Sequence, residues 1–351
     1  MDFTFSDEQR MVADTVRALL ADRCTGADLR RLMGEGARDP GRWQALSDMG
    51  LPGLMLPEAL GGLGLSEVDL VLVAEACGYA ALPEPLVEHA GVAAPLLAAF
   101  AEDARAAAWL DRVAAGAATV ALGHAANPFV ADPDTAGVLL IAREDGLHLI
   151  EAASAGLTRI ASVDPFRRLF EVEAELSPDT RLADAQTVAP HLALALDRGA
   201  LFAAAQGLGL AQRAVDMAAD YARARMQFGK PIGANQAVKH HLATCQTRIE
   251  FARPVVYAAA AQIGQQDLFS RARISHAKLA ALGAADLAAR AAIQVHGAMG
   301  YSWEVDAHFY LKRALALTGT WGDEAFHRAR VAERVFGAPL DPDRTFASAA
   351  A

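Results

Sequence analysis

The spacing of apolar side chains changes its period twice along the chain. In residues 1–115 apolar positions recur at the three- and four-residue spacing of amphipathic helices. Ser6, followed three residues later by Gln9, forms a capping-box pattern in front of such a run. Further helical stretches surround Trp43, ending at Gly50, and cover residues 66–77, while the glycine-rich segment 57–64 reads as a loop. These features predict an N-terminal helical domain over residues 1–115.

Short β-type runs replace the helical pattern in the next part of the chain. β-branched or alternating residues occupy 119–122, 137–142, 147–151 and 169–173. Asp145 and Gly146, between two of these runs, are a two-residue hairpin signal. We therefore predict a small antiparallel β domain within residues 116–183.

Long alanine- and leucine-rich helical patterns fill the rest of the sequence. They cover 191–226, 235–263, 267–297 and 304–334, after a proline- and aspartate-rich stretch at 177–190. Four long helices with short connections are typical of a bundle. The predicted fold is mainly α with a small β module: an N-terminal helical domain, a middle β domain and a C-terminal four-helix bundle over residues 184–351.

Composition narrows the classes of protein that fit this pattern. The 351 residues carry 32 basic and 42 acidic side chains without a dense basic block, which argues against a nucleic-acid binder. No uninterrupted apolar run reaches the roughly 18 residues of a spanning helix, and the start Met1-Asp2-Phe3 is acidic where a secretory signal is basic. Three widely separated cysteines predict neither a disulfide framework nor a thiolate metal site. We expect a cytoplasmic protein that binds no membrane and no metal.

Two segments of the C-terminal half carry candidate chemistry. In RMQFGKPI, residues 225–232, an arginine, an amide and an aromatic stand at a helix end, and Gln236 opens the next helix. Arginine together with free backbone N–H groups suits a pyrophosphate, although a plain helix C-terminus with a Gly-Pro stop fits the spacing as well. In QVHGAMGYSWE, residues 294–304, a helix ends in glycines where a backbone can approach a ligand closely, or where a simple C-cap and turn can form.

Together the two segments resemble the acyl-CoA dehydrogenase family. RMQFGKPI with NQAVKH (235–240) is similar to that family's arginine–phenylalanine–glycine turn, and QVHGAMGYSWE to its glutamine–glycine–glycine segment. FSDEQ (5–9) and LPEALGGLGLS (56–66) also fall where the family has its first-domain landmarks. The resemblance covers essentially the whole chain and implies an FAD enzyme that desaturates a CoA thioester between its α and β carbons.

The resemblance also implies roles for individual residues. Asp197 matches an acidic position that helps to hold the substrate. The positions that contact the FAD of a neighbouring subunit in the family are here Arg225, Gln227, Phe228, Gln236, Gln294 and Gly297.

The chain departs from the family at the catalytic base. Trp321 stands where the usual glutamate belongs, and Gly199 stands at the second position used by some members. Neither residue can take a proton. Asp323 and Glu324 lie close by in sequence, but a shift of two residues on a helix turns a side chain by roughly 200°. The β domain also lacks the family's segments that cover the flavin and the thioester.

These departures suggest the shorter, base-lacking subunit of a bacterial two-chain, steroid-type acyl-CoA dehydrogenase. We expect an α2β2 heterotetramer with a full-length subunit, or else a self-dimer, acting on a bulky acyl-CoA and passing electrons to an acceptor flavoprotein. Two alternatives stay open. The chain can be a complete, divergent flavoenzyme, such as an oxidase or an enzyme for a non-CoA substrate, or a cofactor-free structural homologue.

Overall fold

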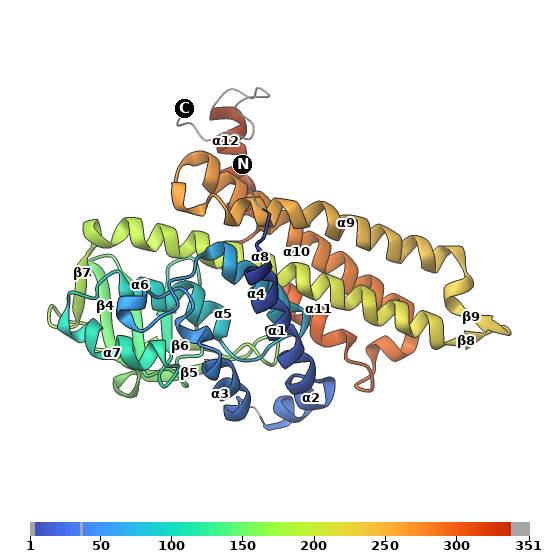
Figure 1. Ribbon diagram of the computed structural model, residues 1–351, viewed down its shortest axis with the longest axis horizontal. Coiled ribbons are helices and arrows are strands. Elements are labelled where there is room, and N and C mark those ends of the chain that lie inside the picture. Colours follow the sequence, from blue (N-terminus) through green and yellow to red (C-terminus); the bar gives the residue numbers. More distant parts are fainter. Residues whose placement is uncertain (1–3, 36–37, 338–351) are drawn as a thin grey trace.

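The computed structural model describes residues 4–35 and 38–337. A helical N-terminal part, a β module and a helical C-terminal part follow one another along the chain. Helix α8 (Ala185–Ala224) extends from the β module to the opposite end of the molecule (Figure 1). The fold is therefore organised along this one 40-residue helix.

The N-terminal part is helical, as predicted. The predicted capping box is confirmed, because the Ser6 hydroxyl accepts from the Gln9 amide at 3.2 Å and the Gln9 side chain accepts from the Ser6 amide at 3.0 Å. Segment 57–64 is a loop with one short 3-10 turn, η2 (Glu58–Leu60). The other elements are α1 (Asp7–Arg23), α2 (Gly26–Glu35), α3 (Pro40–Asp48), η1 (Leu51–Gly53), α4 (Glu67–Tyr79), α5 (Leu86–Glu88), the π-helical turn η3 (His89–Ala93), α6 (Ala94–Ala98) and α7 (Ala104–Ala114).

The β module consists of two small sheets. Their strands are β1 (Val120–Gly123), β2 (Val130–Ala131), β3 (Val138–Arg143), β4 (Gly146–Glu151), β5 (Gly156–Ile160), β6 (Leu169–Glu173) and β7 (Arg181–Asp184). The sheets have the orders β1-β3-β4-β7 and β2-β6-β5. All pairs are antiparallel except β1 with β3, which are parallel because the chain crosses to the second sheet as β2 between them. The predicted hairpin joins β3 to β4, but its loop is Glu144 and Asp145, one residue earlier than the predicted Asp145 and Gly146.

Up to residue 337, where the described structure ends, the C-terminal part contains five helices rather than the four that the sequence predicts. After α8 come α9 (Gln236–Ala260), α10 (Leu268–His296), α11 (Ala307–Thr318) and α12 (Glu324–Gly337). The predicted helix 304–334 is broken at residues 319–323, where Trp321 and Gly322 have positive φ values of 55° and 89°. By length and composition α8 could span a membrane, and 56% of its most apolar window is buried.

Helix α8 lies unusually close to α4. A Cβ atom added at Gly209 would lie 2.0 Å from the Glu75 carbonyl oxygen, and one at Gly78 would lie 2.1 Å from the Gln206 carbonyl oxygen. Only glycine permits such backbone approach. The crossing fixes the depth at which the middle of α8, including Gly199, sits in the molecule.

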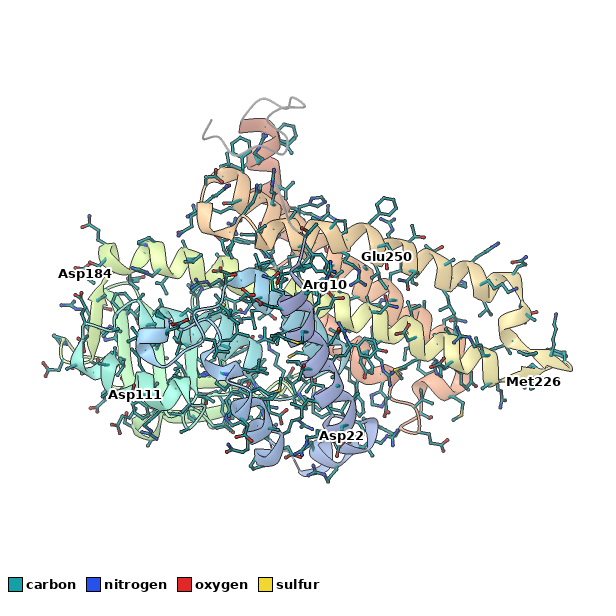
Figure 2. All side chains as sticks on the ribbon, in the orientation of Figure 1. Arg10, Asp22, Asp111, Asp184, Met226 and Glu250 are labelled. Atoms are coloured by element: carbon teal, nitrogen blue, oxygen red, sulfur yellow. The ribbon has the colours of Figure 1, made fainter. Side chains whose placement is uncertain are left out.

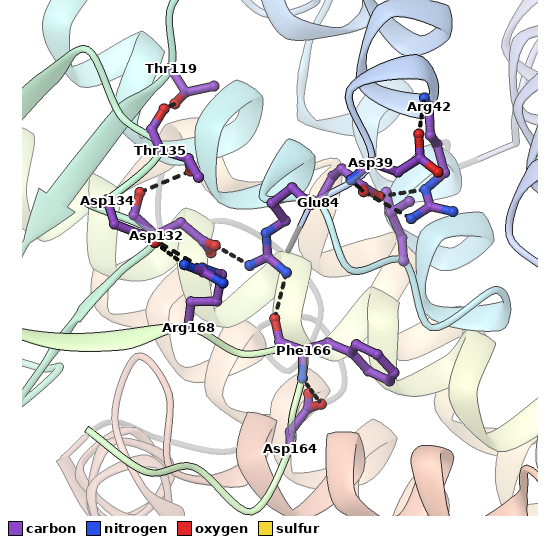
Figure 3. Close-up of polar contacts among 12 residues, drawn as sticks. Asp39, Arg42, Glu84, Thr119, Asp132, Asp134, Thr135, Asp164, Phe166 and Arg168 are labelled. Atoms are coloured by element: carbon purple, nitrogen blue, oxygen red, sulfur yellow. Dashed lines mark hydrogen bonds and ion pairs between the residues drawn. The ribbon is translucent and has the colours of Figure 1, made fainter. Parts of the chain in front are cut away.

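Buried ion pairs stabilise the N-terminal part and attach it to the β module (Figure 3). Arg42 and Glu84 are each 1% exposed and pair through two hydrogen bonds of 2.6 and 2.9 Å within the N-terminal part. Arg38 pairs with Asp132 of the β module and donates to the Phe166 carbonyl at 2.7 Å. These contacts hold the β module against the N-terminal helices and thereby set one wall of the cleft described below.

Candidate functional site

Helix α8 ends in a hairpin that projects from the bundle. β8 (Met226–Gln227) pairs antiparallel with β9 (Lys230–Pro231), and the loop residues Phe228 and Gly229 have φ values of 51° and 77°. Positive φ at both central positions is the signature of a type I′ turn, which favours asparagine and glycine over a bulky residue. Phe228 is 98% exposed. Figure 2 shows the neighbouring Met226 at the extreme end of the molecule.

All six predicted cofactor residues lie on exposed positions at the hairpin or at the neighbouring helix ends. Arg225, Gln227 and Phe228 belong to the hairpin. Gln236 is the first residue of α9, whereas Gln294 and Gly297 lie at the end of α10. The ring of Tyr221 on α8 stacks on His296 of α10 with centroids 4.3 Å apart, which brings the ends of these two helices together. We call the hairpin and the adjoining end of α10 the bundle-end surface.

The chemistry of the bundle-end surface suits an anionic, partly planar ligand. The hairpin, residues 225–231, carries Arg225 and Lys230 and no acidic residue, although the whole chain has a net charge of −10. Within the described residues the Arg225 guanidinium makes no ion pair. Gly297 has a φ of 60°, and nothing lies within 4 Å of a Cβ added there. An arginine, two amides and an open backbone are donors of the kind that bind a pyrophosphate.

Two exposed aromatic residues beside this surface were not predicted from the sequence. Tyr301 is 82% exposed and Trp303 is 60% exposed, in and just after the 3-10 turn η7 (Gly297–Tyr301). Both residues belong to segment 294–304, one of the two segments that the sequence indicates as candidate sites. Their exposure is a tertiary property that apolar periodicity does not reveal.

The two positions at which the sequence predicts a missing base, Trp321 and Gly199, lie against each other. The Trp321 indole packs on α8 so closely that a Cβ added at Gly199 would lie 2.2 Å from Cδ2 of the ring. Trp321 is 3% exposed, and its backbone N–H donates to Asn127 Oδ1 at 2.7 Å. The centroid of its ring lies 5.6 Å from that of His124 in the β module. The indole and the glycine that the sequence predicts at the two base positions therefore form one packed contact; that these are the family's base positions stays a prediction.

Two buried basic side chains, those of Lys278 and His327, hold the loop that carries Trp321 through hydrogen bonds to its carbonyl groups. Lys278, 2% exposed, donates to the carbonyls of Thr320 and Gly322, and burial lowers the pKa of its ammonium group to about 7. His327 Nε2 donates to the Trp321 carbonyl at 2.9 Å, and its Nδ1 accepts from Ser275 at 2.9 Å. Burial lowers the pKa of His327 to about 4, so its imidazole is neutral at pH 7. These contacts hold the indole on α8.

The acidic residues near Trp321 in the sequence or on α8 bind other groups. Asp197 is 1% exposed and accepts from Arg330 at 2.6 Å, with Arg271 at 3.6 Å, and burial raises its pKa against the pull of both arginines. Asp323 accepts from the backbone of α12, and Glu324 pairs with an arginine one turn later at 2.7 Å. Neither contact involves Trp321 or Gly199. The substrate-holding role of Asp197 stays a prediction.

A cleft of about 810 Å³ separates the β module from the first turns of α8. His124 and Asn127, which both contact Trp321, line it together with Phe129, Phe170 and Leu196. Its few charged groups are Arg143, Glu144 and Glu171. Trp321 thus contacts two of the residues that line this cleft, whereas the bundle-end surface lies at the other end of α8 (Figure 1).

Comparison with known proteins identifies the family that has this architecture. Residues 6–117 match the family model "Acyl-CoA dehydrogenase, N-terminal domain", and residues 191–336 match "Acyl-CoA dehydrogenase, C-terminal domain". The acyl-CoA dehydrogenase IpdE2 of Mycobacterium tuberculosis is 33% identical over 323 residues, which cover 88% of this chain and 91% of that protein.

Two solved structures share the fold. The ChsE4-ChsE5 complex from Mycobacterium tuberculosis gives a TM-score of 0.83 at 22% identity, covering 97% of this chain and 100% of that chain. The steroid ACAD Tcur3481-Tcur3483 gives a TM-score of 0.81 at 24% identity, covering 93% and 97%.

These matches define the class of the protein as a flavin-dependent oxidoreductase of mainly helical fold with a small β module. The chain belongs to the acyl-CoA dehydrogenase family, whose members use FAD. The sequence prediction of family and fold is confirmed.

Proposed function

We propose that this chain is a subunit of a heteromeric acyl-CoA dehydrogenase and that it holds the FAD of a second chain without removing the substrate's α proton. The observation that carries the proposal is the packing of the Trp321 indole on Gly199. Both places where a base is expected are taken by residues that cannot ionise. The groups suited to a dinucleotide lie at the other end of α8, where they are exposed and free to reach another chain.

The residues of the bundle-end surface fit an FAD. The Arg225 guanidinium would pair with the pyrophosphate, and the amides of Gln227 and Gln294 would add hydrogen bonds to it. Gly297 would allow the backbone to approach, and Phe228 would pack against the planar part of the cofactor. When bound, FAD supplies the hydride acceptor for desaturation of a CoA thioester. This chain's part is to bind and orient the cofactor.

The comparisons support a two-chain assembly and a bulky substrate. One solved neighbour is a complex of two named chains, and another is described as a steroid ACAD that is also named as a pair. We propose an α2β2 heterotetramer in which a full-length subunit supplies the base and the flavin pocket. The substrate would be a bulky acyl-CoA such as a steroid derivative, with a flavoprotein as electron acceptor.

The test is to purify the chain alone and together with a full-length homologue encoded beside it. We expect little flavin and no dehydrogenase turnover from the lone chain, and stoichiometric FAD with turnover from the complex. Full FAD and turnover by the lone chain would establish instead a complete, divergent flavoenzyme. A complex whose FAD content is the same with and without this chain would indicate a cofactor-free scaffold.

Arg225→Ala provides a residue-level test with a matched control. In the complex this substitution should reduce retained FAD at least tenfold, because a charge-assisted contact to the pyrophosphate is lost. Arg223→Ala removes the same charge two residues earlier, where the side chain pairs with Asp220 at 2.8 Å on the exposed face of α8. It should leave FAD content unchanged. Equal flavin loss in both variants would show that net charge, not a specific contact, holds the cofactor.

A further inference from the structure

The aromatic residues beside the bundle-end surface have no role within the chain. Tyr301 is 82% exposed and Trp303 is 60% exposed, and both lie in or just after the turn that begins at Gly297 of that surface. Single exposed apolar residues are ordinary on a protein surface, but two large aromatic residues on one turn indicate a contact site. Tryptophan and tyrosine are also the residue types that most often carry the binding energy of protein interfaces.

The turn that presents these aromatic residues is firmly braced. Asp306, at its far end, accepts two hydrogen bonds from Arg30 of α2, at 2.9 and 3.0 Å. Gly300 lies so close to α10 that a Cβ added there would be 2.5 Å from the Ile293 carbonyl oxygen. A braced turn loses little conformational freedom when it docks, which favours binding.

The imidazole under Trp303 is incompletely bonded. His308 packs between Trp303, 4.6 Å away, and Phe309, 4.2 Å away, measured between ring centroids. Both of its ring nitrogens are buried, and neither has a hydrogen-bond partner among the described residues. A neutral imidazole carries one N–H that needs an acceptor, and a buried donor without one is unfavourable. The lone chain therefore leaves a polar group that a docked protein can satisfy once the indole shifts.

We propose that Tyr301 and Trp303 are the anchors by which this chain docks on the flavin-bearing second chain, and that the docked chain supplies the hydrogen bond missing at His308. The proposal rests on the proposed function, because it takes the heteromer as given. The stacking of Tyr221 on His296 brings the hairpin to the end of α10 where the turn begins, and the hairpin's basic residues, Arg225 and Lys230, complement a partner that presents the phosphates of a dinucleotide.

The experiment measures the affinity of the purified chain for the immobilised full-length subunit loaded with FAD. Trp303→Ala should weaken association by about tenfold or more, and Tyr301→Ala should also weaken it. The matched control is Phe336→Ala, which removes an 88% exposed aromatic residue at the end of α12 and should not change the affinity. At saturating concentration the Trp303→Ala complex should retain full FAD, unlike Arg225→Ala.

His308→Phe separates the two parts of the proposal. Phenylalanine keeps the ring but removes both unbonded nitrogens, so the lone chain should melt at a higher temperature while its affinity falls about fivefold. Wild-type affinity in this variant would overturn the assignment of His308.

Wild-type affinity in Trp303→Ala, or an equal loss in Phe336→Ala, would overturn the assignment of the anchors. Self-association of the lone chain that Trp303→Ala abolishes, without an effect on the heteromer, would assign the turn to a second copy instead. If the wild-type chain does not bind the full-length subunit at all, the proposed function itself fails.

Discussion

Gly199→Ala tests directly whether the Trp321 indole packs against α8 at Gly199. In most helix interiors this substitution stabilises a protein by up to about 1 kcal/mol, because alanine has the higher helix propensity. Here the new Cβ would lie 2.2 Å from Cδ2, 2.4 Å from Cγ and 2.5 Å from Cε2 of Trp321. Ordinary contact starts at about 3.4 Å, so the indole or the helix has to move by more than ~1 Å.

The surroundings leave little room for that movement. The carbonyls of residues 320–322 are bonded by Lys278 and His327, and the Trp321 amide is bonded by Asn127. Overpacking of a tight core costs about 1–3 kcal/mol, which outweighs the propensity gain. We expect Gly199→Ala to lower the free energy of unfolding by about 1–2 kcal/mol.

The assay is urea denaturation of the lone chain followed by helical circular dichroism. Gly283→Ala on α10 is the matched control, since nothing lies within 4 Å of a Cβ added there, and it should stabilise by up to about 1 kcal/mol. In a Trp321→Ala background Gly199→Ala should become stabilising as well, giving a coupling energy of about 2–3 kcal/mol. Gly199→Ala that stabilises the wild type as Gly283→Ala does would refute the packing.

Three further substitutions or conditions probe the buried charges. Stability should fall between pH 6.5 and 4, because burial lowers the pKa of His89 and His327 to about 4 and only the unfolded chain takes up those protons; a constant urea midpoint would contradict this. The stability of the wild-type chain should rise from pH 7 to 9, because Lys278 releases its proton near pH 7 in the folded chain but keeps it in the unfolded chain. Lys278→Met should remove this rise, and parallel curves of stability against pH for the two proteins would contradict the prediction. Glu84→Gln breaks a fully buried ion pair and should cost about 3–5 kcal/mol by urea denaturation, against less than about 1 for Asp220→Asn in an exposed pair.

The elements that sequence predicts well are those with local causes. The capping box at Ser6 and Gln9 involves side chains three residues apart, and its hydrogen bonds form as the pattern predicts. The hairpin at residues 144–145 likewise depends on a short turn between two alternating runs. Helical period alone also locates most of α8, α9 and α10. Sequence predicts a start for α8 six residues too late, because Pro190 is typical of a break although it lies within the helix.

The features that sequence misses depend on distant contacts or on unusual backbone. Phe228 lies in a type I′ turn that its residue type disfavours, so a plain helix stop was as good an interpretation. The break between α11 and α12 needs a left-handed Trp321, which no propensity rule expects. The parallel pairing of β1 with β3 follows from a crossover through another sheet.

In the candidate site too, the sequence identifies individual residues but does not show which of them are in contact. The sequence names Trp321 and Gly199 separately, as two positions that lack a base, but it does not reveal that they touch. The structure joins residues 122 positions apart into one packed pair, in which the ring requires the glycine and the glycine leaves room for the ring. The two residues that cannot act as a base therefore form one packed contact rather than two unrelated substitutions.

Because these two residues pack on each other, a single substitution of Trp321 by glutamate would not be enough to give this chain a catalytic base. A glutamate at position 321 would leave the backbone of α8 uncovered and would put a carboxylate where the neighbouring His124 is itself desolvated, with a lowered pKa. The loop would still be held in its left-handed shape by Lys278 and His327. Several changes are thus needed before this cleft can abstract a proton. Under the proposed function the chain contributes to the chemistry through the opposite end of α8, where Arg225 and Gln294 remain exposed and Gly199 has no influence.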